Sequence, residues 1–493
     1  MCLKSIPKAF VRPLNLSPRA MSCLKYQPPV NREMRTLDRS FFVSKLPLCV
    51  VKFPEPKNIS AFAKEFKDSI LRVPRIPHVV KLDQTVENKS AKGKTLACDN
   101  GIVSKGVLLN SSMTSTEEAR AQLSPEALQF LETNNAEILP YEYVLDYDFW
   151  KAEEILRAVL PEEYLDEIPT GFTVTGHIAH LNLRQEFKPF ASLIGQVILD
   201  KNNKIETVVD KVSSIATKFR TFPMEVIAGR GGDLVVEQKE SNCTFRFDFS
   251  KVYWNSRLHT EHERLVKQYF QPGQVVCDVF AGVGPFAIPA GKKEVIVLAN
   301  DLNPDSFKYL QENIELNKVS TLVKPFNLDG AQFISDSITL LQQWRESNDG
   351  KLQVPLRISH HDRKRQKKQD AKEAPKFKEL QIPFEINHFV MNLPDSSITF
   401  LDRFVGLYKG TSIKTLPWIH LHCFEKYGID EEPPMEELYH RVHSRIATSL
   451  HTDKQALAFD NLRFHLVRKV SPTKPMFCVS FQLPEQVAFA DST

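Results

Sequence analysis

Residues 275–286, Val-Val-Cys-Asp-Val-Phe-Ala-Gly-Val-Gly-Pro-Phe, predict the architecture of the second half of the chain. An apolar run ends in Asp278 and passes directly into a turn that contains Gly282 and Gly284, with Pro285 at the expected start of a helix. Glycine has no Cβ to keep the backbone away from a bound nucleotide, and a helix that begins beside the ligand favours its binding. The third glycine of a dinucleotide fingerprint is absent, so this turn alone is weak evidence.

Further strand ends make the evidence stronger. The next apolar run, Glu294 to Ala299, is followed by Asn300-Asp301, which places a carboxylate where the ribose of a cofactor is expected. Beyond it come Asn327-Leu-Asp-Gly330 and Phe389-Val-Met-Asn-Leu-Pro394. The turn, the ribose acid, an adenine-side Asp and a strand-end Asn-x-Pro together indicate an S-adenosylmethionine-dependent methyltransferase core.

Bulk composition sets wide limits on function. The 493 residues suffice for two or three domains, and 42% hydrophobic with 25% charged residues is ordinary for a globular protein. A net charge of +4 permits an RNA partner without implying one. Eight scattered cysteines without a Cys-x-x-Cys pair suit neither a zinc site nor a disulfide framework, so we expect no metal and free thiols. No apolar run has the length of a membrane span, and we expect no membrane partner.

Alternating apolar strands and helical stretches after residue 250 predict an α/β fold, a parallel sheet covered on both faces. The expected class is a class I (Rossmann-like) methyltransferase domain with a mostly parallel seven-stranded sheet, preceded by two smaller α+β domains. The last two strands should pair antiparallel. We expect the strands at 274–280, 294–300, 321–327, 385–392, 416–423, 463–469 and 476–482.

Composition also divides the chain into segments. We expect a transit-like basic leader at 1–35, an α+β domain at 36–135, an α+β domain at 136–250 and the methyltransferase domain at 251–493. A basic insertion at about 346–381 is expected to be a solvated loop. The leader carries only positive charge before Glu33, which favours import into the mitochondrial matrix over a disordered basic tail. Starts at Met21 or Met34 would add cytoplasmic and nuclear pools.

Five segments in combination identify a family. The chain resembles the tRNA (guanine-N1)-methyltransferases that modify position 37, in their eukaryotic and archaeal form, with a fungal-like first domain. This resemblance implies S-adenosyl-L-methionine as cofactor, tRNA bound through its anticodon loop and body, a monomer, and the first step toward wybutosine in the phenylalanine tRNA. The segments are Thr175–Arg184, Phe222–Gly229, Ser250–Arg264, Asp278–Phe286 and Asn392–Pro394.

The expected reaction sets requirements for catalytic residues. Guanine N1 carries a proton, so its methylation needs a base, and negative charge builds toward O6 as the proton leaves. The resemblance assigns Glu261 as general base, Arg220 as the cation near O6 and Asn392 as the group that orients the flipped base. It also assigns Tyr253 and Arg257 to the pocket between cofactor and tRNA. On spacing alone, Arg257 and Glu261 would be a surface ion pair on one helix face.

The cofactor is expected to lie along the same strand ends. Asp301 should accept the ribose hydroxyls, Leu302 should lie against the adenine, and Asp329 with Gly330 should meet the adenine amino group. Asn392 and His262 should line the methionine side. The full set of expected cofactor residues is His262, Asp278, Gly282, Gly284, Asp301, Leu302, Asp329, Gly330 and Asn392.

Two other functions remain open at this stage. The methyltransferase core could act on an exocyclic amine of a nucleobase or on a glutamine amide, although Asn392-Leu-Pro394 is followed by Asp395 where an aromatic residue is usual. A non-catalytic tRNA-binding factor could retain the fold without the chemistry. The preferred tRNAs, the acceptance of inosine, the role of the insertion and the way the first domain contacts tRNA do not follow from the sequence.

Overall fold

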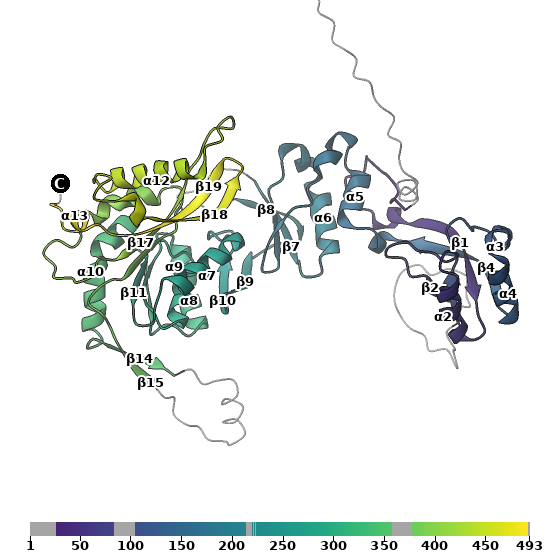
Figure 1. Ribbon diagram of the computed structural model, residues 1–493, viewed down its shortest axis with the longest axis horizontal. Helices are drawn as coiled ribbons and strands as arrows, with labels where there is room; N and C mark the ends of the chain where they lie inside the picture. Colours follow the sequence, from purple (N-terminus) through teal and green to yellow (C-terminus); the bar gives the residue numbers. More distant parts are fainter. Residues whose placement is uncertain are drawn as a thin grey trace, which may run out of the picture. The chain divides into compact units, whose positions relative to one another are not determined.

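The computed structural model describes residues 26–82, 104–212, 219, 221, 223–356 and 377–491 (Figure 1). The chain forms two compact units, one comprising residues up to Thr170 with Arg184–Asn203 and the other Gly171–Leu183 with Lys204 onward. Most of the expected leader, and Arg220, lie outside the described residues, so both interpretations stay predictions. Within the described part of the chain, no helix combines the length and apolarity needed to cross a bilayer.

The first unit contains a four-stranded antiparallel sheet in the order β2-β3-β1-β4. Strand β4 pairs with β1 over nine residues, from Ser44↔Leu145 to Lys52↔Glu137. The boundary expected at residue 135 is therefore wrong, because it would separate β1 from its longest partner. The elements are β1 (Ser44–Lys52), α2 (Pro56–Glu65), β2 (Val79–Leu82), β3 (Ser104–Leu108), α3 (Thr116–Gln122), α4 (Pro125–Thr133) and β4 (Glu137–Leu145).

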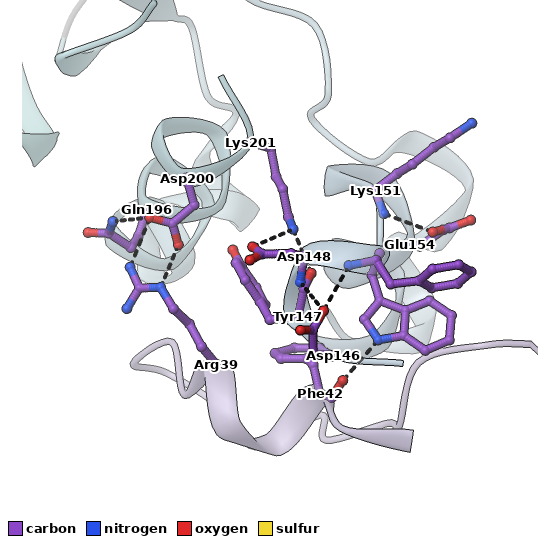
Figure 2. A network of polar contacts seen from close by, with 12 residues as sticks. Arg39, Phe42, Asp146, Tyr147, Asp148, Lys151, Glu154, Gln196, Asp200 and Lys201 are labelled. Atoms are coloured by element: carbon purple, nitrogen blue, oxygen red, sulfur yellow. Dashed lines mark hydrogen bonds and ion pairs between the residues drawn. The ribbon is translucent and has the colours of Figure 1, made fainter. Parts of the chain in front are cut away.

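A polar network fastens helices of the same unit to the start of this sheet (Figure 2). Arg39 donates to both carboxylate oxygens of Asp200 at 2.8 and 2.9 Å, and Lys201 donates to the carbonyl of Tyr147 at 2.5 Å. The buried indole N–H of Trp150 donates to the carbonyl of Phe42 at 2.9 Å. The elements involved are η1 (Arg39–Phe42), η2 (Tyr147–Phe149), α5 (Ala152–Val159) and α6 (Ala191–Lys201), with η3 (Glu162–Glu167) and η4 (Gln185–Phe190) nearby in sequence.

The second unit begins with a small sheet and a hairpin. The sheet has the order β5-β6-β7-β8, and β9 pairs antiparallel with β10. Phe245 and Phe247 of β10 belong to the same hydrophobic cluster as Val297 and Leu310 of the following region, so the boundary expected at 250 does not separate two cores. The strands are β5 (Thr173–Thr175), β6 (Ile178–Leu181), β7 (Thr207–Lys211), β8 (Met224–Gly229), β9 (Val235–Glu240) and β10 (Cys243–Asp248).

A seven-stranded sheet in the order β13-β12-β11-β16-β17-β19-β18 forms the centre of this unit. The first five strands are parallel, and β19 runs antiparallel to both β17 and β18. All seven predicted strands and the antiparallel last pair are confirmed. Their bounds are β11 (Val275–Asp278), β12 (Ile296–Asn300), β13 (Val323–Phe326), β16 (His388–Met391), β17 (Trp418–Phe424), β18 (Arg463–Ser471) and β19 (Lys474–Gln482).

Helices cover both faces of this sheet. One hydrophobic cluster joins the sheet to α7 (His259–Gln268), α8 (Ala287–Lys292) and α9 (Pro304–Leu316), and a second joins it to α10 (Gly330–Glu346), η6 (Ser397–Phe404), α12 (Met435–Ser449) and α13 (Glu485–Ala488). After β11 the chain adds β12 and β13 on one side of it and then crosses to the other side to form β16. The strand order reverses at this point, so a ligand is expected to bind at the carboxyl ends of these strands. Two short turns, η5 (Ser256–Leu258) and η7 (Phe459–Asn461), complete the unit.

The basic insertion is more ordered at its ends than the sequence indicated. Helix α10 continues to Glu346, and β14 (Lys351–Pro355) pairs antiparallel with β15 (Phe377–Gln381). Leu352 and Val354 are buried in the core cluster, which explains why this part forms a ribbon and not a solvated loop. Residues 357–376, with the basic run, lie outside the described residues.

Replacing Trp150 with Phe should destabilise the first unit. The substitution keeps an aromatic ring but removes the N–H that the buried carbonyl of Phe42 accepts, which costs about 1–3 kcal/mol of unfolding free energy. Urea unfolding of the full chain measures the change. Tyr143→Phe, on the partly exposed face of β4, is the control and should shift stability by less than about 0.5 kcal/mol. Equal stabilities for the two variants would contradict a role for this bond.

Candidate active site

The glycine turn after β11 combines a packing requirement with open space. Gly282 and Gly284 have φ values of +55° and +100°, in the region that side chains disfavour. A Cβ on Gly284 would lie 2.7 Å from the side chain of Ile288, whereas a Cβ on Gly282 would meet no atom within 4 Å. Gly284 is therefore fixed by packing, and Gly282 leaves the room beside the backbone that a ligand needs.

Asp301, directly after β12, holds this turn in place. One carboxylate oxygen accepts the N–H of Gly282 at 2.8 Å and the other accepts the N–H of Asn303 at 2.9 Å. Burial raises the pKa of Asp301, and these backbone bonds oppose the rise. The helix cap of α9 is Asn303, so the carboxylate is not needed there. Two backbone N–H groups and Ser306 use most of the acceptor sites of the carboxylate, which leaves about one site for a hydroxyl group. The neighbouring Leu302 is 36% exposed, as an adenine platform requires.

Asn300 joins three strand ends, a role that the sequence analysis did not assign. Its buried amide donates to the carbonyls of Val279 and Leu328, both at 3.1 Å, and accepts the N–H of Leu328 at 2.9 Å. These bonds connect the segments that follow β11, β12 and β13. A polar residue that ends an apolar run was the only sequence signal for it.

Asp329 and Gly330 have clear structural roles at the start of α10. Asp329 is exposed and caps the helix by accepting the N–H of Ala331 at 2.9 Å. A Cβ on Gly330 would lie 2.7 Å from the ring of Phe280. Both residues therefore lie at the expected edge of the sheet, and their contact with adenine stays a prediction.

Two buried acceptors lie unsatisfied at the centre of the same edge. Among the described residues, neither oxygen of Asp278 accepts a well-formed hydrogen bond, although the backbone N–H of Phe280 acts to lower its pKa, and the side-chain oxygen of Asn392 has no partner. Asp278 is opposite Val390 in the parallel ladder, so Asn392 emerges from the neighbouring strand two residues further on. Burial and the nearby Asp301 raise the pKa of Asp278 to about 8. An ammonium group would supply donors to both acceptors and favour the carboxylate, so these residues fit the amino-acid end of S-adenosylmethionine.

Glu261 is a buried carboxylate held by two cations. Its side chain, on α7, accepts hydrogen bonds from Nε and a terminal nitrogen of Arg264 at 2.6 and 2.8 Å, and His422 Nε2 lies 2.8 Å from Oε1. Burial alone would raise the pKa of Glu261, but the bonds to Arg264 and His422 outweigh it and hold the pKa well below its ordinary range. Glu261 is therefore ionised at neutral pH.

His422 and His465 complete the surroundings of this carboxylate. Burial would lower the pKa of His422, but Cys478 and Glu261 raise it to about 10, so the ring is protonated at neutral pH. A carboxylate oxygen of Glu261, a ring nitrogen of His422 and Sγ of Cys478 all lie within 4.8 Å of one another. His465, on the edge strand β18, places Nε2 3.6 Å from Oε2 of Glu261 and is 45% exposed. Neither these groups nor Arg264 was predicted from the sequence as partners of Glu261.

Arg257 does not pair with Glu261. Arg257 is exposed in the 3-10 turn η5, whereas Glu261 is buried in α7 and bonded to Arg264. Both the shared helix face and the surface ion pair are therefore wrong, because the two residues do not belong to one continuous α-helix. Tyr253 is 50% exposed. Burial lowers the pKa of Arg468 on β18, and the positive charge of Arg257 lowers it further.

His262 connects the β9–β10 hairpin to the glycine turn. Its Nδ1 lies 2.6 Å from a carboxylate oxygen of Glu240, and its ring packs edge-on against Phe286 at 4.7 Å between centroids. The residue is buried, so a contact with the methionine side of the cofactor stays a prediction.

Comparisons with known proteins agree with this geometry. The family model of the TRM5/TYW2 methyltransferase domain matches residues 236–340, and that of the TYW2 N-terminal domain matches residues 152–232. Among solved structures, the complex of aTrm5 and tRNALeu covers 89% of this chain and 100% of its own, with a TM-score of 0.51 and 18% identity. At this identity the likeness concerns the fold.

Curated relatives are much more similar. The tRNA (guanine(37)-N(1))-methyltransferase of Saccharomyces cerevisiae is 65% identical over 94% of this chain and 95% of its own length. The Candida albicans (strain SC5314) protein of the same name is 50% identical over 95% of this chain and 99% of its own length. With identities of this size along nearly the whole length, the chain belongs to the tRNA (guanine(37)-N(1))-methyltransferase family.

Proposed function

We propose that this chain transfers a methyl group from S-adenosylmethionine to N1 of guanosine 37 in tRNA. The names of the fungal relatives support this substrate. The observation that carries the proposal is a buried, ionised carboxylate, Glu261, linked through His422 to the edge of the sheet where Asp278 accepts no well-formed hydrogen bond from the described residues. That edge offers a place for a cofactor and, next to it, a group that can accept a proton.

The cofactor supplies the methyl group from its sulfonium when it is bound. Asp301 would accept the ribose hydroxyls while keeping its bonds to the N–H groups of Gly282 and Asn303. Leu302 would cover the adenine. Asp278 and the oxygen of Asn392 would accept hydrogen bonds from the ammonium group, which satisfies atoms that are otherwise buried without partners.

Glu261 would remove the proton of guanine N1. Its depressed pKa keeps the carboxylate available throughout the neutral range, yet the same hydrogen bonds make it a weaker base. Asn392 would orient the base after it leaves its stack. Arg220 remains the predicted cation near O6, and Tyr253 and Arg257 are exposed where a nucleotide could approach.

Mass spectrometry of nucleosides distinguishes this function from the alternatives. After incubation of the full chain with S-adenosylmethionine and unmodified tRNA, N1-methylguanosine is the expected product. Another methylated product would favour an amine or amide substrate, and the absence of any product would favour a non-catalytic binding factor. A buried carboxylate argues against an exocyclic amine, which needs a base less.

Replacing Asp301 with Asn should weaken S-adenosylmethionine binding by about 1–3 kcal/mol, because charge-assisted bonds to the ribose are lost. The amide can still accept the N–H of Gly282, so the turn should keep its shape. Isothermal titration calorimetry measures the affinity. Asp305→Asn, in the first turn of α9, removes the same charge nearby and should leave the affinity unaltered. Equal cofactor affinities for the two variants would remove Asp301 from the site.

Replacing Glu261 with Gln should slow single-turnover methylation by roughly 10²–10⁴-fold, the usual contribution of a general base. The remaining rate should rise with pH, because guanine then loses its proton unaided. Glu263→Gln on the exposed side of α7 is the matched control and should keep the normal rate. Cofactor affinity and thermal unfolding of both variants test whether the substitution disturbs the fold. A near-normal rate for Glu261→Gln at neutral pH would contradict its role.

The first unit offers a basic cavity for the body of the tRNA. A cavity of about 840 Å³ is lined by Lys67 and Arg72 together with Arg32, Arg75 and Arg157. Arg75 is bonded to Glu154, whereas the exposed Lys67 and Arg72 form no ion pair with described residues. Free cations at a surface cavity are suited to phosphates.

The double variant Lys67→Glu/Arg72→Glu should therefore bind tRNA more weakly and with a shallower salt dependence, while cofactor affinity stays the same. Filter binding across a salt series measures both properties. Lys45→Glu/Lys57→Glu, which changes the charge of the same unit equally at exposed lysines paired with acids, is the control. Identical salt slopes for wild type and the cavity variant would contradict the proposed contact.

A further inference from the structure

We propose that His465 accepts the proton that Glu261 takes from guanine N1 and passes it to solvent. This inference rests on the proposed function and extends it, because a base that is buried must release its proton before the next cycle. Glu261 exposes about 1% of its side chain, whereas His465 exposes 45%. Their closest atoms, Oε2 and Nε2, are 3.6 Å apart. A small rotation of the imidazole, or one bridging water, closes that distance to hydrogen-bond length.

The other groups around Glu261 cannot take the proton. On α7, Arg264 is already fully protonated and has no acceptor atom. His422 of β17 is a buried cation, because Cys478 and Glu261 raise its pKa to about 10, and it therefore has no free lone pair. Cys478 of β19 and Asp278 of β11 are both buried away from solvent, and Asp278 interacts with His422. Among the described neighbours of Glu261, His465 of β18 combines an acceptor nitrogen with contact to solvent.

The charge state of His465 suits this role. Burial lowers the pKa of His465, Arg264 lowers it further, and Glu261 acts in the opposite direction. The ring is therefore neutral at neutral pH and can accept a proton. A carboxyl group whose pKa is held below its usual range gives its proton readily to a neutral imidazole.

The proton and electrons balance along this route. As N1 forms its bond to the methyl group, the bond between that methyl group and sulfur breaks and its electron pair stays on sulfur. The electron pair of the N1–H bond stays on the base, and the proton moves to Oε2 of Glu261. It then moves to Nε2 of His465, while Nδ1–H of the resulting imidazolium releases a proton to water. One proton thus enters solvent for each methyl group transferred.

A different role for His465 would be a contact with the RNA. Strand β18 is the edge of the sheet, and it also carries Arg468, near Arg257 and Tyr253, and the exposed Lys469. A histidine that only bound RNA would affect the affinity for tRNA and not the fate of a proton. The two roles therefore predict different measurements.

The test is steady-state methylation over many turnovers by full-length His465→Ala with saturating tRNA and S-adenosylmethionine, because the proton must leave Glu261 before each further cycle. The rate at pH 7 should fall by at least about 10-fold, less than the ~10²–10⁴-fold typical of a direct general base. Millimolar imidazole should restore much of the loss, because it can reach the exposed site and accept the proton. His465→Gln fills the same space without a basic nitrogen and should be equally slow. Lys469→Ala, on the same strand, should keep the normal rate and show no response to imidazole.

The pH profile gives a second measurement. In the wild type, the rate should fall on the acidic side as His465 becomes protonated, and His465→Gln should lack this decline. A normal rate for His465→Ala, or a slow rate with weakened tRNA affinity and no recovery by imidazole, would overturn the inference. A wild-type protein that forms no N1-methylguanosine would instead refute the proposed function, so the two failures are distinguishable. Unaltered cofactor affinity in both variants excludes a folding defect as the cause of slow methylation.

Discussion

Parallel pairing of β11 with β16 is the constraint on which the site depends. These strands are far apart in the sequence, yet their ladder places Asp278 opposite Val390 and brings Asn392 out at the same edge. Pairing of β12 with β11 adds Asp301, and pairing of β17 with β16 adds His422. Parallel strands all present their carboxyl ends on one side, so side chains from four strand ends converge without any direct sequence link between them.

Burial of Glu261 then decides the electrostatics of the site. A carboxylate without partners in this position would be costly, and its pKa would rise. Arg264 and His422 reverse that effect by donating hydrogen bonds to the ionised form. The result is a carboxylate that remains charged across the neutral range. Its ionisation therefore cannot produce a pH dependence near neutrality, and any such dependence must come from groups with pKa values closer to that range.

Much of the fold could be predicted because its signals are local. Strands β11 and β12 are short apolar runs that end in Asp278 and Asn300, Asn392 follows the apolar run of β16, and the glycine turn marks the first of them. The pairing of β4 with β1 was not visible, because Glu137–Leu145 alternates exposed and partly buried residues and resembles the start of a new domain. The ribbon β14–β15 was hidden for a similar reason, since only Leu352 and Val354 are buried in its first strand.

The candidate site shows the same limit more sharply. The positions of Asp278, Gly282 and Asp301 at a turn or strand end were predicted because they depend on adjacent residues, and their roles toward a cofactor stay predictions. The two histidines beside Glu261 could not be predicted, because His422 and His465 reach it through sheet pairing, whereas Arg264 lies only three residues away on the same helix. Spacing even suggested the wrong partner: four residues separate Arg257 from Glu261, but the 3-10 turn rotates by a different angle per residue than the α-helix that follows.

Asp278 at the strand ends and the cluster around Glu261 are electrostatically coupled. His422 contacts Glu261 directly, and its charge also lowers the pKa of Asp278, against the larger effects of burial and of Asp301. A positive group bound at Asp278 would therefore compete with the proton on His422, because two cations near one carboxylate repel each other. The hydrogen bond between His422 and Glu261 therefore responds to the charge at Asp278. Pairing of β11, β16 and β17 thus couples two parts of one sheet edge through a single histidine.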